Sequence, residues 1–245
     1  MIILIGSQAI KNHFPDFSRK PKDLDYIITN SPEPNTKSTR EIEYLHNPVF
    51  DGYPHKMLLP NDLYTLKISH LFWDINWDKH MFDVQFLKSK GCELDMVLFY
   101  KLYTNWNVEH GKNVRSDLNM SATDFFDNAV SCEYDHDDIH LLINPNPIYK
   151  KIHKDGEEVD VDSDKFELLS FEDKCDLVRE EVYVMAWERF KHMPYKHAYS
   201  RMLKKFIMNH APMWEALFII ENYIILHKPI INYYKKIEDG LQSIK

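Results

Sequence analysis

The first 45 residues constrain the fold most strongly, because short apolar runs alternate there with turns and loops. Residues 1–5 form an apolar run that ends at Gly6 and Ser7. Two further runs, residues 23–28 and 41–45, place apolar side chains next to acidic ones, which is typical of strands with one solvated face. We therefore expect three strands here, joined by a tight turn and two loops.

Three acidic residues in these strands have the spacing of a metal site. Residues two apart on a strand point to the same face, so Asp23 and Asp25 lie side by side, roughly 7 Å apart at Cα. Glu43, between apolar Ile42 and Tyr44, is the best candidate for a third carboxylate on a neighbouring strand. Magnesium takes one or two carboxylates together with substrate phosphates, and a third carboxylate completes a two-metal clamp. We therefore expect Asp23, Asp25 and Glu43 to bind Mg²⁺ or Mn²⁺.

The order and spacing of these pieces are similar to a known signature. Three motifs resemble the DNA polymerase β-type nucleotidyltransferase superfamily: Gly6-Ser7, then Asp23-Leu24-Asp25, then Ile42-Glu43-Tyr44. The signature of that superfamily begins with an apolar residue, then Gly, then Gly or Ser. After a spacer come an Asp, an apolar residue and a second acid, and a third acid follows on a later strand. The resemblance covers residues 1–90 and is closest to the small minimal nucleotidyltransferases, including antitoxin-paired and antibiotic-modifying types.

One arginine and two later helical runs extend the resemblance. Arg19, just before the acidic pair, matches a frequent arginine of the family. Residues 61–67 resemble the helix that follows the core strands, and they end at Lys67. Residues 79–84 resemble the next helix, with His80 where the family often has Asp.

The resemblance implies an enzyme that moves a nucleoside monophosphate from an NTP to an acceptor and releases pyrophosphate. Asp23 and Asp25 would bind both metal ions, and Glu43 would lower the pKa of the acceptor as a ligand or a base. The residues that the resemblance places at the phosphates are Gly6, Ser7, Arg19 and Lys67. Support of the acidic cluster is a second role that the resemblance leaves open for Lys67.

The predicted fold class is α+β/α. Residues 1–90 would form a nucleotidyltransferase core, a small mixed β-sheet backed by helices, and residues 91–245 an all-helical domain. Apolar periodicity and capping residues predict helices at residues 7–13, 61–71, 78–88, 94–106, 122–130, 170–190, 199–208 and 213–226. A short further strand is expected at residues 55–59, and a basic loop at residues 110–121.

Composition narrows the class of partner. The net charge of −8 argues against broad electrostatic capture of duplex nucleic acid. Basic stretches at residues 110–115 and 196–205 are compatible with RNA as the acceptor, while a protein or a small molecule stays open. The 3 cysteines lack metal-type spacing and fit reduced thiols. Without a signal-peptide pattern or a long apolar span, we expect a cytoplasmic protein with no membrane contact.

A rival hypothesis is a catalytically inactive nucleotidyltransferase-fold protein that only binds, such as an antitoxin-like or inhibitor module. The carboxylate trio argues against it, because a binding module has no need of three metal-binding acids. The sequence leaves open the oligomeric state, the acceptor and the base preference among NTPs.

Overall fold

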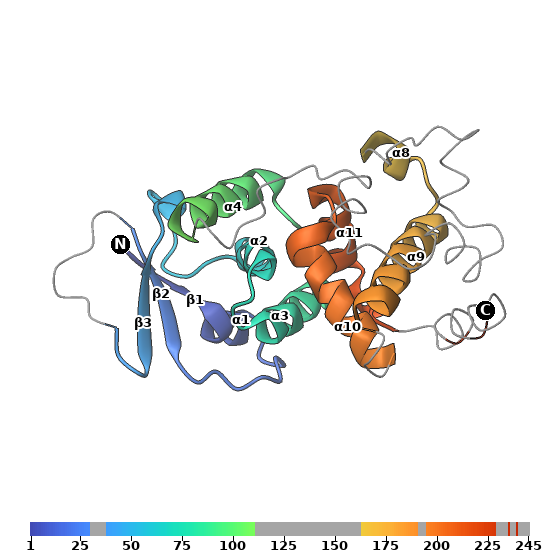
Figure 1. Cartoon of the computed structure of the whole chain (residues 1–245). Helices are drawn as coiled ribbons and strands as arrows, with labels where there is room; N and C mark the ends of the chain where they lie inside the picture. Colours follow the sequence, from blue (N-terminus) through green and yellow to red (C-terminus); the bar gives the residue numbers. More distant parts are fainter. Residues whose placement is uncertain (30–37, 111–162, 191–194, 229–234, 236–238, 240–245) are drawn as a thin grey trace. The chain divides into compact units, whose positions relative to one another are not determined.

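The computed structural model describes residues 1–29, 38–110, 163–190, 195–228, 235 and 239. Packing divides the chain into two compact units, Met1–Val114 (unit 1) and Arg115–Lys245 (unit 2), and each is described by itself (Figure 1). The expected limits of a nucleotidyltransferase core, 1–90, and of a helical domain, 91–245, stay a prediction, because packing alone does not define such a core.

Unit 1 contains a three-stranded mixed sheet, which confirms the small mixed sheet expected from the sequence. Its strands are β1 (Ile2–Ile5), β2 (Leu24–Ile28) and β3 (Ile42–His46), in the order β1-β2-β3. Strand β1 is antiparallel to β2, and β3 is parallel to β2. The register places Ile5 and Glu43 on either side of Asp25, so one row across the sheet carries two of the expected acids.

Helices surround a core centred on one buried helix of unit 1. The helices are α1 (Gly6–His13), α2 (Pro60–Ser69), α3 (Trp77–Ser89) and α4 (Met96–His110), with short 3₁₀ turns at Pro48–Phe50 and His70–Phe72. Every residue of α2 from Leu63 to Ser69 is buried, and α2 packs against α1, α3 and α4. Helix α2 therefore determines where α3 and α4 lie relative to the sheet.

The prediction of a strand at residues 55–59 is wrong, because only one bridge forms there, between Leu4 and Met57. Two backbone hydrogen bonds join this segment to β1, Leu4 N to Lys56 O at 2.8 Å and Leu58 N to Leu4 O at 3.1 Å. The pairing stops because α2 starts at Pro60, whose ring fixes φ and whose nitrogen has no hydrogen to donate to a ladder.

In unit 2, residues 163–190 and 195–228 contain helices and no strand. The elements are α8 (Ser163–Glu167), α9 (Phe171–Phe190), α10 (Tyr195–Lys205), a π-helical turn (Phe206–His210), α11 (Met213–Glu221) and α12 (Tyr223–Leu226). The predicted helix start at Ser170 is confirmed, because its Oγ accepts a hydrogen bond from Asp173 N at 3.1 Å.

The helix predicted over residues 213–226 is instead two helices, separated at Asn222. The side-chain amide of Asn222 donates to Phe218 O at 2.8 Å, a local bond that competes with regular helix bonding. The basic loop at 110–121 and the helix at 122–130 lie outside the described residues, except that His110 ends α4.

Two further expectations concern membranes and thiols. None of the helices in the described residues combines the length and the apolar character that crossing a bilayer requires. Cys92 and Cys175 are buried free thiols.

A fully buried carboxylate ties three segments of unit 1 together. Asp83 on α3 accepts hydrogen bonds from Arg19, with Nε at 3.0 Å and Nη2 at 2.7 and 2.6 Å from its oxygens. Lys67 Nζ on α2 lies 3.2 Å from the same carboxylate, and only 4% of Lys67 is exposed. The contact therefore connects the loop before β2 to both helices.

We predict that Asp83→Asn lowers the unfolding free energy of unit 1 by about 3–5 kcal/mol, because it leaves the buried Lys67 charge uncompensated. Urea-dependent hydrogen exchange in peptides of α2 and α3 measures this change in the full-length chain. Asp16→Asn is the matched control, since Asp16 pairs with Lys90 at the surface and should hardly change the result. Equal, small effects in both variants would contradict a structural role for Asp83.

Candidate functional site

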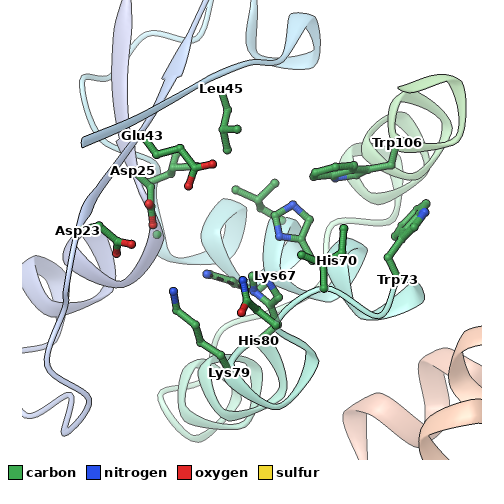
Figure 2. Close-up of a pocket in the computed structure, with 15 residues that line it drawn as sticks. Asp23, Asp25, Glu43, Leu45, Lys67, His70, Trp73, Lys79, His80 and Trp106 are labelled. Carbon is green, nitrogen blue, oxygen red and sulfur yellow. Dashed lines mark hydrogen bonds between the residues drawn. The ribbon is translucent and has the colours of Figure 1, made fainter. Parts of the chain in front are cut away.

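A pocket of about 200 Å³ lies where the sheet of unit 1 meets α2, α3 and α4 (Figure 2). Three kinds of side chain line it: the acids Asp23, Asp25 and Glu43, the cations Lys67 and Lys79, and the aromatic rings of His70, Trp73, His80 and Trp106. The remaining wall consists of Ile5, Gly6, Leu45, Leu66, Ile75 and Asn76. One side of the pocket is thus strongly acidic, and the other is aromatic.

The three acids expected from the sequence meet in this pocket. Asp25 lies on β2 directly beside Glu43 on β3, and Asp23 immediately precedes β2. Glu43 is exposed, while Asp23 and Asp25 are half-buried. Within the described part of the chain, Asp23 Oδ1 is buried without a hydrogen-bond partner. An acceptor atom in this position suits a ligand that supplies positive charge.

The surroundings of Asp25 disfavour the ionised form of its side chain. Burial and the charge of Asp23 raise the pKa of Asp25 above its ordinary value, although Lys67, Lys79 and Arg19 act in the opposite direction. A carboxyl pKa raised by folding contributes stability that is present at low pH and is lost as the pH rises through the folded-state pKa. At neutral pH the ionised Asp25 therefore opposes folding, and a bound cation would offset this effect.

The donor chemistry of the pocket fits a divalent cation such as Mg²⁺, which prefers carboxylate oxygens. The side-chain positions do not form a complete ligand set, because the described residues contain no group of three or more His, Cys, Asp and Glu side chains placed to hold one ion. Asp23 and Asp25 are the residues that would hold a metal first. Glu43 lies on the rim of the same pocket and is a further candidate.

Gly6 allows the backbone to approach Asp25 closely. Its φ of +68° is in the left-handed region, and a Cβ here would overlap Asp25 Oδ2 and lie 2.8 Å from Cγ. Ser7 is buried, is not among the lining residues, and has no hydrogen-bond partner for its Oγ among the described residues. The expected phosphate contacts of Gly6 and Ser7 stay predictions.

The two other residues expected at the phosphates are both held by Asp83. Arg19 does not line the pocket, and its guanidinium is bidentate to Asp83. Lys67 lines the pocket, yet its ammonium contacts Asp83 and lies 3.4 Å from His80 Nδ1. Both roles expected for Lys67 stay predictions, because its ammonium contacts Asp83 and its charge also lowers the pKa of Asp25.

An aromatic wall, formed by His70, Trp73, His80 and Trp106, was not expected from the sequence. The ring centroids of His70 and Trp106 are 4.7 Å apart, those of His70 and His80 are 4.8 Å apart, and those of Trp73 and Trp106 are 5.8 Å apart. Burial and the nearby Lys67 charge lower the pKa of His80 far below its usual range, so this ring is neutral at physiological pH. No local pattern in the sequence predicts this wall, because its members come from separate helices and turns.

Comparison with known families identifies the chain only at the level of sequence families. A domain of unknown function (DUF7277) matches residues 2–99, and another domain of unknown function (DUF7275) matches residues 62–239. The second match spans most of the chain, so this protein belongs to the DUF7275 family. No curated protein matches the chain, and no solved structure does. The two matches overlap on residues 62–99, which contain α3 and most of α2.

We predict that Gly6→Ala destabilises unit 1 more than Gly52→Ala does. Both glycines have positive φ, and backbone strain alone costs about 1–2 kcal/mol, but only a Cβ at Gly6 meets Asp25, whereas nothing lies within 4 Å at Gly52. Adding Asp25→Ala to Gly6→Ala should restore part of the lost unfolding free energy. Equal losses in the two glycine variants would show that the contact with Asp25 is not tight.

Proposed function

We propose that this protein is a metal-dependent nucleotidyltransferase that moves a nucleoside monophosphate from an NTP to an acceptor. The observation that carries the proposal is the row formed by Asp25 and Glu43, with Asp23 beside it, against a glycine at the start of a helix. Two carboxylates two residues apart and a third on the next strand can hold the divalent ions that neutralise charge in phosphoryl transfer.

Each residue of the acidic side would then have a defined role. When bound, Mg²⁺ or Mn²⁺ would neutralise charge on the phosphates and activate the acceptor. Asp23 and Asp25 would hold the metal, and Glu43 would act as a further ligand or accept the proton of the acceptor. The acceptor oxygen or nitrogen forms a bond to the α-phosphorus, the bond to the bridging oxygen breaks, and pyrophosphate leaves with the electron pair.

The aromatic wall supports a nucleotide as the substrate. Trp106 is half-buried and lines the pocket, and its ring is fixed by His70 and Trp73. Stacking of a nucleobase on an aromatic side chain is worth about 1–3 kcal/mol and tolerates any base. The pocket therefore offers a carboxylate side for metal and phosphate and an aromatic side for a base. RNA, a protein or a small molecule stays open as the acceptor.

We predict that Asp25→Asn keeps the fold but lowers transfer by a factor of about 10² or more, because metal-held charge in the transition state is lost. Pyrophosphate release measures this in the presence of Mg²⁺, each NTP and candidate acceptors, with circular dichroism as the check on folding. Asp51→Asn, at an exposed aspartate of unit 1, is the control and should retain activity. Unchanged transfer in Asp25→Asn would refute the site, and NTP binding without pyrophosphate release would favour the inactive binding module.

A further inference from the structure

Three cations, Arg19, Lys67 and Lys79, act electrostatically on Asp25 in the pocket, but two of them already pair with another carboxylate. The guanidinium of Arg19 and the ammonium of Lys67 both contact Asp83, which is fully buried on α3. Moving either cation towards a phosphate would leave a buried carboxylate without one of its partners, which is unfavourable. Arg19 and Lys67 therefore serve the packing of α2, α3 and the loop before β2.

Lys79 is the third cation, and it is placed differently. It lies in the first turn of α3, lines the pocket and is half-buried. Figure 2 shows its side chain reaching from α3 towards Asp23 and Asp25. Among the described residues, the side-chain ammonium of Lys79 has neither an ion pair nor a hydrogen bond, so its three N–H groups stay available to a ligand.

The charge of Lys79 already acts on the acidic pair, because it lowers the pKa of Asp25 against the effects of burial and Asp23. A metal ion held by the carboxylates would neutralise much of the negative charge that Lys79 now faces. A polyanionic ligand that brings its own negative charge to the metal would then become its partner.

We propose that Lys79 binds the β- and γ-phosphates of the nucleotide and neutralises the departing pyrophosphate, whereas the resemblance places Gly6, Ser7, Arg19 and Lys67 at the phosphates. This inference rests on the proposed function, since it concerns the same pocket and the same reaction. Lys79 would contact phosphate oxygens directly, whereas Asp83, with Arg19 and Lys67, would only position the helix that carries it.

Two probes with opposite expectations test this role in the full-length protein. Magnesium tripolyphosphate, measured by calorimetry, reports phosphate binding without a nucleobase. Mn²⁺, measured by electron paramagnetic resonance, reports metal binding to the carboxylates. We expect Lys79→Ala to weaken tripolyphosphate binding by about 10-fold to 100-fold, the worth of a hydrogen bond between charged groups. The same variant should bind Mn²⁺ as tightly as the wild type or more tightly, because a nearby positive charge is gone.

Two matched variants complete the experiment. Lys88→Ala removes the same charge from the last turn of the same helix and should leave both affinities near those of the wild type. Lys79→Arg keeps the charge and should retain most of the tripolyphosphate affinity. Together these results would separate a direct contact from a general change in net charge.

The outcomes that overturn the inference are distinct from those that overturn the proposed function. If the wild type binds Mn²⁺ and tripolyphosphate, and Lys79→Ala binds tripolyphosphate equally well, Lys79 is only a counter-ion of the acidic pair and the inference fails alone. If the wild type binds neither probe, the proposed function fails, and the role of Lys79 fails with it.

Discussion

Asp83 is the buried charge on which the arrangement of unit 1 depends. A carboxylate with no exposure needs partners that satisfy its oxygens, and Arg19 and Lys67 supply them from two other segments. Because Lys67 comes from α2 and Asp83 from α3, the contact fixes one helix against the other beside the sheet. The position of the pocket wall opposite the carboxylates follows from this contact.

Unlike Asp83, the carboxylates of the pocket do not favour folding at neutral pH. Asp23 and Asp25 repel each other, Asp25 is half-buried, and the backbone of Gly6 approaches so closely that no other residue fits without movement. None of these features helps a chain to fold at neutral pH. Local costs of this kind are expected where a site is shaped for a ligand and the surrounding structure holds it in place. Asp83 thus has the environment of a structural charge, whereas Asp25 has the environment expected of a ligand-binding charge under the proposed function.

Sequence reasoning succeeded where the information is local. Apolar runs predicted the three strands, and the apolar residues that flank Glu43 predicted it on a strand next to Asp25, where the structure has it. It failed where tertiary contacts decide which side chains pair and which residues line the pocket. The sequence around Arg19 and Lys67 does not indicate that Asp83 is their partner, because these contacts form only when α2 packs on α3. The aromatic wall was missed for the same reason, because residues far apart in the sequence build it.

One measurement tests most directly the claim that Asp25 serves a bound cation rather than the fold: the unfolding free energy of unit 1 at pH 7, with and without Mg²⁺, in the wild type and in Asp25→Asn. Without Mg²⁺ we expect the variant to be the more stable protein, because the repulsion with Asp23 and the cost of burying the charge are removed. Mg²⁺ should stabilise the wild type by mass action and leave the variant unchanged. A variant that is less stable than the wild type, together with no effect of Mg²⁺ on either protein, would contradict the claim.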